Sequence, residues 1–191
     1  MVAQVGDEVT DFKVGDRVAI EPGEPCRECE YCKSGQYNLC PHMEFMATPP
    51  YDGAFCEYVS HPADFLYHLP DSVTYEQATL VEPFSVGLQA CKRADIKPGS
   101  TVVIMGMGPV GLMAVVAAKA YGATNIIVSD LEDNRLEAAK RLGATTAINI
   151  KNEDVVERIK ELTDVQGVNY AIETAAVSYT HLRAHETPEH L

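Results

Sequence analysis

The 191-residue sequence has no apolar stretch close to the length that spans a bilayer, no internal repeat and no low-complexity segment. It is also poor in basic residues, with 15 Lys and Arg against 28 Asp and Glu and a formal net charge of −13. A chain with this charge is repelled by phosphate backbones and by anionic headgroups, so we expect neither nucleic acid nor membrane as a partner. The hydrophobic content of 46% is typical of a globular protein, and the predicted location is the cytoplasm.

Four of the six cysteines lie in one short polar segment, EPCRECEYCKSGQYNLC, with the spacing C-x2-C-x2-C-x7-C: Cys26, Cys29, Cys32 and Cys40. This spacing lets one loop wrap four thiolates around a single ion, and four-sulfur coordination is typical of closed, structural zinc sites. Disulfides would need an oxidising compartment, and no secretory signal precedes the segment. An iron–sulfur cluster is the stronger alternative because Pro41 follows the last cysteine, but the ferredoxin run places that cysteine three residues on rather than seven. The spacing therefore favours zinc.

Residues 2–67 consist of short apolar runs separated by turn residues, which is typical of part of a small β-barrel or sandwich. The predicted strands lie at 5–9, 14–20 and 53–59. The cysteine segment is expected to be a loop inserted after Ile20. Cys56 and Cys91 lie singly among apolar residues, and they are predicted to be small core residues.

Two helices are expected next, one with Thr74 as its N-cap that runs toward Pro83, and one over 86–93. After a turn at 97–100 the pattern becomes an alternation of strands and helices, which indicates right-handed crossovers and a parallel sheet. The predicted strands are 101–105, 125–129, 145–150 and 167–173. The predicted helices are 109–121, 132–142 and one capped by Asn152, with Val155, Val156, Ile159 and Leu162 on one face. The predicted fold class is α/β.

A glycine-rich turn, Gly106-Met107-Gly108-Pro109-Val110-Gly111, lies between the first of these strands and the first helix. Glycines at these three positions allow a tight turn, a close approach of a pyrophosphate to the backbone, and close packing of helix on strand. The phosphates would lie at the positive end of the helix. The hexapeptide is a weak signal alone, but its place between strand and helix predicts a dinucleotide site.

Asp130 ends the second strand, 19 positions after Gly111, where a carboxylate can accept hydrogen bonds from the ribose hydroxyls. A 2′-phosphate would be repelled there, so the sequence favours NAD over NADP. Arg135 complicates this choice, because an arginine near the second strand is what NADP would require. Its alternative role is a surface ion pair with Glu132 at i,i+3.

A four-cysteine zinc lobe in a β domain that precedes a Rossmann unit resembles the zinc-containing medium-chain alcohol dehydrogenases, over residues 2–176. Three segments are more similar to the polyol branch, the sorbitol and xylitol dehydrogenases: FKVGDRVAIEPG, YNLCPHMEFMATPPYDGAFCEYV and LVEPFSVGLQA. The stretch ATPPYDG at 47–53 is the most specific of them. Threonine dehydrogenases and simple alcohol dehydrogenases share the zinc lobe but are less similar there.

The resemblance implies a partial GroES-like β-barrel domain with a structural zinc lobe at 1–83, followed by a truncated Rossmann doubly wound parallel sheet at 84–176. It implies structural zinc on the four cysteines of the segment. The residues implied to contact NAD are Gly106, Gly108, Val110, Gly111, Asp130 and Arg135. Glu82 matches a glutamate that faces the catalytic zinc in this branch, through its water or the substrate. From the sequence alone, Glu82 could be merely a helix-end charge or a partner in an ion pair at the domain junction.

The sequence also departs from the family. The ligands of the catalytic zinc, a cysteine and a His-Glu pair, lie upstream of the VGDEV segment in this branch, and none of the three histidines before residue 70 has the matching context. We therefore expect a gene fragment cut at both ends, which lacks two strands and the usual oligomer contacts. Residues 177–187 resemble the translation of a transposon-derived sequencing adapter, so 177–191 is expected to be a non-native tail. The alternative is a metal-binding tail built on His181, His185 and Glu186.

The resemblance implies that the intact protein oxidises a secondary alcohol of a polyol, sorbitol or xylitol, to a ketose, with zinc as Lewis acid and NAD as hydride acceptor. Its implied partners are a small-molecule polyol and further copies of itself in a homo-oligomer. The fragment is expected to be inactive, because the Lewis acid has no ligands in it. The alternatives are an L-threonine or small-alcohol dehydrogenase, a non-catalytic zinc- and nucleotide-binding remnant, and a fragment that does not fold stably because a sheet edge is uncovered.

Overall fold

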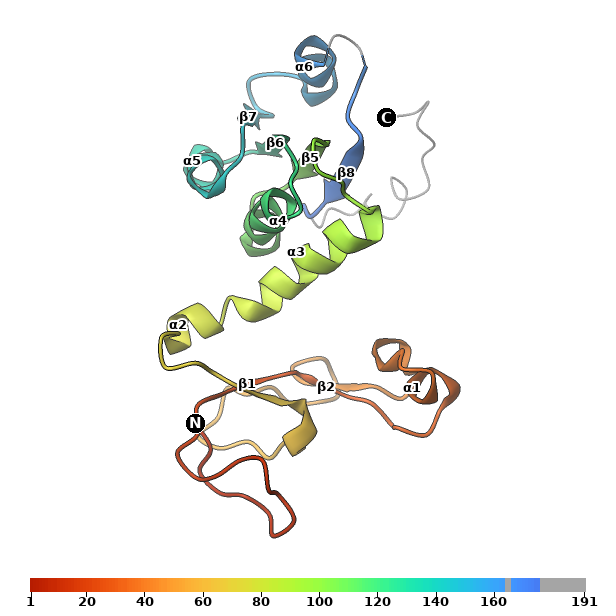
Figure 1. Cartoon of the computed structure of the whole chain (residues 1–191). Coiled ribbons are helices and arrows are strands. Elements are labelled where there is room, and N and C mark those ends of the chain that lie inside the picture. Colours follow the sequence, from red (N-terminus) through yellow and green to blue (C-terminus); the bar gives the residue numbers. More distant parts are fainter. Residues whose placement is uncertain (164–165, 176–191) are drawn as a thin grey trace. The chain divides into compact units, whose positions relative to one another are not determined.

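The computed structural model describes residues 1–163 and 166–175 (Figure 1). The predicted tail at 177–191 lies outside these residues. The chain forms two compact units, Met1–Thr79 and a second that begins at Leu80, a few residues before the predicted boundary. None of the described helices combines the length and the apolar character needed to cross a membrane.

The first unit contains two small antiparallel sheets: β1 (Val18–Ile20) with β4 (Leu66–His68), and β2 (Gly23–Glu24) with β3 (Glu44–Phe45). Its helices are single turns: α1 (Glu30–Lys33), η1 (Tyr37–Leu39), η2 (Ala63–Phe65) and α2 (Tyr75–Ala78). Among the described residues of this unit, the buried hydrophobic side chains are those of Cys40 and Phe65. So small a core is typical of a domain that needs a metal or a further partner to stay folded.

Several predictions for the first unit are wrong. The runs 5–9 and 53–59 are irregular, and only 18–20 of the run 14–20 is a strand. Apolar alternation alone does not make a strand, because each strand needs a neighbour for its N–H and C=O groups, and these runs have no ladder partner among the described residues. Cys56 is exposed, with its thiol directed at the carbonyl of Tyr58, so it is not a core residue, whereas Cys91 is fully buried as predicted.

The second unit contains a parallel sheet in the order β7-β6-β5-β8. The strands are β5 (Thr101–Met105), β6 (Asn125–Asp130), β7 (Thr146–Asn149) and β8 (Tyr170–Glu173). The helices are α3 (Val81–Ala94), α4 (Pro109–Ala120), α5 (Asp133–Leu142) and α6 (Val155–Leu162). The predicted alternation of strand and helix and the parallel pairing are confirmed.

Both faces of this sheet are buried, as the continuous apolar runs of its strands indicate. Val102 and Ile104 of β5 belong to the core that includes α4 and α5, while Val103 faces the other side, with the α6 residues Val155 and Ile159. Helices thus cover both faces, with α4 and α5 on one side of the strands and α6 on the other (Figure 1). This is the doubly wound arrangement.

The last helix differs from its prediction in two ways. Its N-cap is Asp154, whose Oδ1 accepts a hydrogen bond from the N–H of Glu157 at 2.9 Å, and not Asn152. An aspartate two residues further on competes for the same role and reaches an N3 N–H. Val156 and Leu162 are 45% and 41% exposed, so only half of the predicted apolar face is covered.

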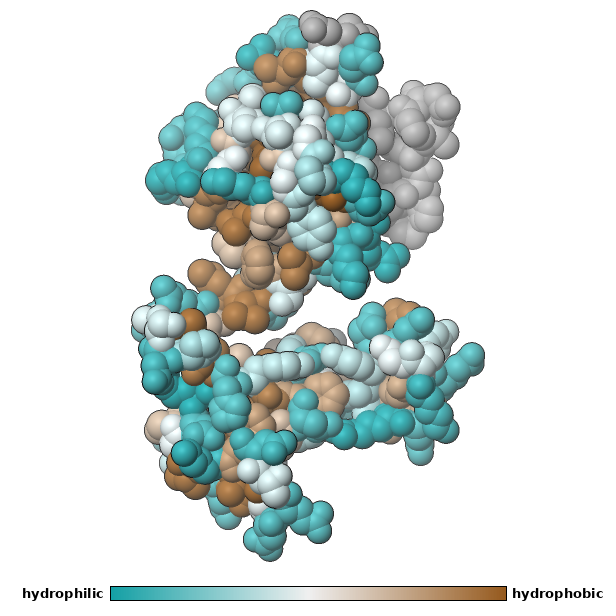
Figure 2. Space-filling model, in the orientation of Figure 1, coloured by the Kyte–Doolittle hydropathy of each residue, from teal (hydrophilic) through white to brown (hydrophobic). Residues whose placement is uncertain are grey.

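Helix α3 starts at Val81, five residues before the predicted start, because Pro83 lies in its first turn, where a missing N–H is tolerated. It contacts α4 closely at Gly87, since a Cβ there would lie 2.7 Å from the backbone nitrogen of Ala114. Hydrophobic residues in and beside α3 also stay exposed, and Figure 2 shows brown surface over this helix. They are Leu80, Val81, Val86 and Leu88.

Candidate functional site

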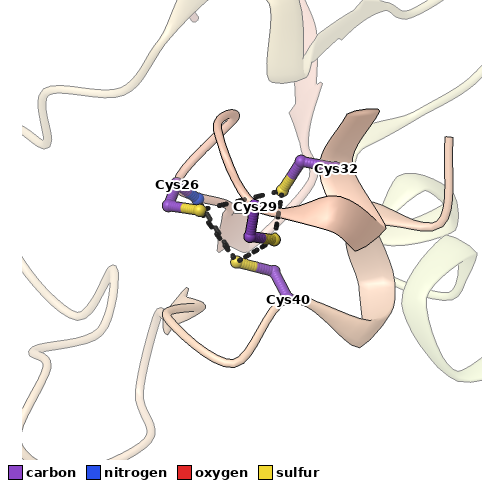
Figure 3. Close-up of side chains that lie close together, drawn as sticks. All are labelled: Cys26, Cys29, Cys32 and Cys40. Carbon is purple, nitrogen blue, oxygen red and sulfur yellow. Dashed lines mark hydrogen bonds between the residues drawn. The ribbon is translucent and has the colours of Figure 1, made fainter. Parts of the chain in front are cut away.

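The four predicted cysteines converge in the first unit, with their sulfurs turned toward a common centre (Figure 3). The Sγ–Sγ distances include 3.4 Å for Cys29–Cys32, 3.5 Å for Cys26–Cys40 and 4.0 Å for Cys26–Cys32. Four sulfurs at the usual zinc–sulfur bond length stand about 3.8 Å apart in a tetrahedron. The cluster therefore fits a zinc ion, and it is the only group of three or more metal-ligating side chains among the described residues.

Local backbone structure places these sulfurs. Cys29 is the N-cap of α1, Cys32 lies in that turn, and Cys40 is the C-cap of η1. The backbone N–H groups of Glu28 and Cys29 lower the pKa of Cys26 to about 6, whereas burial and the neighbouring thiols raise the pKa of Cys32 to about 12. Metal binding requires all four groups as thiolates, so binding releases protons.

The lobe is attached to the rest of the first unit through Arg27. Its guanidinium donates to both carboxylate oxygens of Asp64, at 2.7 and 2.8 Å, and lies 5.3 Å from the ring centre of Phe65. Arg27 holds the pKa of the Asp64 carboxyl below its usual range through these hydrogen bonds. Arg27 has a φ of 65°, so the turn between the first two cysteines is in the left-handed region. This contact orients the loop that carries the first ligands.

The second candidate region is the glycine turn between β5 and α4. Gly106 has a φ of +88°, which favours glycine and makes the tight turn. A Cβ on Gly111 would lie 1.8 Å from the Gly106 carbonyl oxygen, so helix and turn are in direct backbone contact. A Cβ on Gly108, by contrast, would have no atom within 4 Å among the described residues beyond its chain neighbours. The open side of the turn is therefore at Gly108, where the approach of a diphosphate was predicted.

The N-terminus of α4 faces this opening. Pro109 occupies the first position of the helix and Gly108 is its N-cap. Within the described part of the chain, no hydrogen bond is recorded for the N–H groups of Gly108, Val110 and Gly111. Unpaired N–H groups at a helix start are an anion-binding arrangement.

Asp130 points toward the glycine turn. Its Oδ2 accepts the N–H of Met107 at 2.6 Å and its Oδ1 accepts the N–H of Glu132 at 2.9 Å. The side chain is only 7% exposed, and each carboxylate oxygen retains a second lone pair for a further donor. The guanidinium of Arg135 lies 3.8 Å from Oδ2. Glu132 pairs instead with Lys151 at 3.0 Å, so the alternative Arg135–Glu132 pair is absent among the described ion pairs.

The structure thus brings together the predicted nucleotide residues, which belong to the turn after β5 and to α4, β6 and α5. Glu82 does not join them: it is exposed in the first turn of α3, and no hydrogen bond or ion pair is recorded for it with the described residues. Sequence reasoning missed Thr174, which follows β8 and donates its hydroxyl to the carbonyls of Met105 and Gly106 at 2.8 and 2.7 Å. A polar residue after the fourth strand, at the carboxyl edge of a parallel sheet, was the available signal.

Beside Thr174 lies a hollow of about 260 Å³ between α3, α4 and the end of β8. Its lining is largely apolar and consists mainly of Val86, Ala90, Val110, Ala114 and Ile172. It adjoins the glycine turn through Val110 and Thr174.

Two family models match the chain. The alcohol dehydrogenase GroES-like domain matches residues 1–71, and the zinc-binding dehydrogenase model matches residues 109–186. Sorbitol dehydrogenase of Bacillus subtilis is 60% identical over 174 residues, which are 91% of this chain and 49% of that protein. Probable D-xylulose reductase A of Aspergillus clavatus is 51% identical over 145 residues, 76% of this chain and 40% of that protein. The chain spans about half the length of the curated relatives it matches.

Solved structures agree with this fold. An Escherichia coli oxidoreductase/dehydrogenase of unknown specificity superposes with a TM-score of 0.90 and 46% identity, over 95% of this chain and 53% of that one. A zinc-binding dehydrogenase of Sinorhizobium meliloti, bound to NADP, gives a TM-score of 0.86 and 33% identity, over 94% of this chain and 53% of that one.

Proposed function

Because the chain belongs to the zinc-containing medium-chain alcohol dehydrogenase family, we propose that the whole protein oxidises a secondary alcohol of a polyol, sorbitol or xylitol, to a ketose with NAD. The polyol class is supported by the likeness to a sorbitol dehydrogenase and a probable D-xylulose reductase. The reactant is accordingly a small molecule. The expected homo-oligomer and the cytoplasmic location stay predictions.

One observation supports the proposed binding of a dinucleotide cofactor. The Asp130 carboxylate is directed at the glycine turn, beside unpaired N–H groups at the start of α4 and the open space next to Gly108. When bound, the nicotinamide would accept the hydride, and a catalytic zinc would act as Lewis acid on the alcohol. This chain's residues would contribute orientation. The N–H groups at the start of α4 would hold the diphosphate, and Asp130 would accept hydrogen bonds from the ribose hydroxyls.

The geometry of the cysteine cluster supports a structural rather than a catalytic role for its metal. Four thiolates complete a tetrahedron and leave no position for an alcohol, so no catalytic step passes through this site. No second group of ligands is found in 1–163 and 166–175. We propose that the described residues hold one zinc, at the cysteine cluster, and that the 191-residue chain alone has no turnover.

A substrate panel tests this proposal. The 191-residue chain and a full-length relative are assayed with NAD against sorbitol, xylitol, L-threonine and ethanol. We expect activity on the two polyols from the relative only, and metal analysis should give one zinc per 191-residue chain. Polyol oxidation by the 191-residue chain, or two zinc ions bound to it, would overturn the proposed inactivity. A preference of the relative for L-threonine or ethanol would overturn the polyol assignment.

The cofactor proposal is NAD rather than NADP, because the buried carboxylate of Asp130 would repel a 2′-phosphate. Arg135, half exposed and near that carboxylate, offsets only part of this repulsion. Asp130→Ala should therefore narrow the preference for NADH over NADPH in binding titrations. If the unmodified chain binds NADPH more tightly, the argument from Asp130 is wrong.

For Glu82 we propose the role that the family resemblance implies, a contact with the substrate or with the water of the catalytic zinc. Its carboxylate is exposed and has no recorded partner among the described residues, so it is available for such a contact. Its acidic character in the first turn of α3 also favours the helix through the dipole. Replacing the matching glutamate of a full-length relative by Gln should lower kcat and leave the affinity for NADH unchanged. An unchanged kcat would leave only the helix-end role.

A further inference from the structure

One peptide unit of the glycine turn is held at both of its polar ends. The carbonyl oxygen of Gly106 accepts the hydroxyl of Thr174 at 2.7 Å, and the N–H of Met107 donates to Oδ2 of Asp130 at 2.6 Å. These two groups belong to the same peptide, and their partners come from the ends of β8 and β6, which flank β5 on opposite sides. The peptide therefore spans the two neighbouring strand ends.

This restraint matters because of the backbone at Gly106. A rotation that exchanges the carbonyl and N–H directions of this peptide changes ψ of Gly106 and φ of Met107, and Gly106, which has no Cβ and already has a φ of +88°, adds no side-chain clash to it. After such a rotation the carbonyl would face the carboxylate of Asp130, and the buried N–H of Met107 would face the Thr174 side. The Thr174 hydroxyl has one proton, which is shared between the carbonyl oxygens of Gly106 and Met105. The backbone N–H of Thr174 also donates to the Met105 oxygen at 2.8 Å and so fixes the place of the hydroxyl, which stabilises the observed direction.

We propose that Thr174 is a positioning residue of the nucleotide site, which acts by fixing the Gly106–Met107 peptide. The fixed peptide keeps the Gly106 carbonyl beneath the turn, against Gly111, and away from the side where the phosphates approach. It also commits the Met107 N–H to Asp130, which leaves the N–H groups of Gly108, Val110 and Gly111 for the phosphates. This inference rests on the proposed nucleotide binding, but its first consequence concerns the protein alone.

The test compares three variants of the 191-residue chain. Thr174→Val removes the hydroxyl, Thr174→Ser restores it, and Thr124→Val is the matched control. Thr124 also donates to a backbone carbonyl, that of Gly99 at 3.1 Å, but it precedes β6 and lies at the opposite end of the sheet from the turn. Two quantities are measured: hydrogen exchange of the Met107 amide by NMR, and the dissociation constant of NADH by fluorescence.

For Thr174→Val we expect faster exchange of the Met107 amide and weaker NADH binding, each by about tenfold, the equivalent of one hydrogen bond. Thr174→Ser and Thr124→Val should stay within about twofold of the unmodified chain, at a temperature where all variants are folded. A Met107 amide that exchanges equally fast in Thr174→Val and the unmodified chain overturns the inference. So does faster exchange that Thr174→Ser fails to restore.

The two proposals fail separately. If the unmodified chain does not bind NADH, the proposed nucleotide site is wrong, while the exchange rates still decide whether Thr174 fixes the peptide. If the unmodified chain binds NADH and Thr174→Val binds it equally well, nucleotide binding stands and the positioning role of Thr174 is wrong.

Discussion

Alanine substitutions at Gly108 and Gly111 should separate the two functions of the glycine turn. A methyl group on Gly111 would lie 1.8 Å from the Gly106 carbonyl oxygen and 2.8 Å from Oγ1 of Thr174. The atoms would have to move apart by roughly 1 Å, against a peptide that is hydrogen-bonded at both ends. Overpacking of this kind costs about 3 kcal/mol, so Gly111→Ala should lower the Tm of the second unit by more than about 10 °C.

Gly108→Ala is the matched control. Apart from its chain neighbours, no atom of the described residues would lie within 4 Å of a methyl group there, and the φ of −72° suits alanine, so stability should stay within about 1 kcal/mol. The methyl would nevertheless occupy the space that a diphosphate needs, and NADH should bind at least about tenfold more weakly.

Both effects are measurable on the same samples. Thermal unfolding is followed by far-UV circular dichroism, and NADH binding by its own emission, which is free of tryptophan fluorescence because the chain has none. A Gly108→Ala variant that binds NADH normally would refute the assigned phosphate side. A Gly111→Ala variant as stable as the unmodified chain would refute the packing argument.

Cys29→Ser should abolish zinc binding and unfold the first unit, whose own core is small, while the helical circular dichroism signal of the second unit persists. Acidification should also release the zinc, because protons compete with the metal for the thiolates. Full zinc content in that variant would exclude the four-thiolate site. Asp154→Ala should cost about 1 kcal/mol of stability in urea unfolding and Asn152→Ala almost nothing, and the reverse order would contradict the observed cap. Gly87→Ala should cost about 2 kcal/mol, because its methyl would press on the backbone of Ala114, and an unchanged Tm would disprove the close contact of the two helices.

Apart from the start of α3, the second unit could be predicted from the sequence to within a few residues. The strands β5 and β6 are largely apolar runs rich in β-branched residues, and the helices α4 and α5 stop at or next to a glycine. The first unit could not. Its runs at 5–9 and 53–59 have the composition of strands, but pairing depends on a neighbour that lies elsewhere in the chain. Local pattern also failed where two candidates compete: Asp154 rather than Asn152 caps α6.

In the candidate sites, too, the features carried by a short sequence pattern could be predicted, and the contact that depends on strand pairing could not. Spacing alone predicted that four cysteines meet, because a loop of that length has few other ways to satisfy its thiols, and the sulfurs do converge. The glycine turn and Asp130 were predictable from their order along the chain. For Thr174 the sequence offered only its place after the fourth strand, because its contact with Gly106 spans 68 residues and depends on the pairing of β5 with β8.

The contact at Gly87 has a mechanical consequence for Glu82. The two residues lie on one continuous helix, about 7.5 Å apart along its axis. That helix packs closely against α4, and the first turn of α4 lies beside Gly108, where the diphosphate is predicted to approach. A slide or roll of α3 in its groove would therefore carry the Glu82 carboxylate with it and change its alignment with the glycine turn. A substitution at the contact of α3 with α4 would thus change the position of the Glu82 carboxylate relative to the glycine turn, although neither Glu82 nor the turn is itself altered.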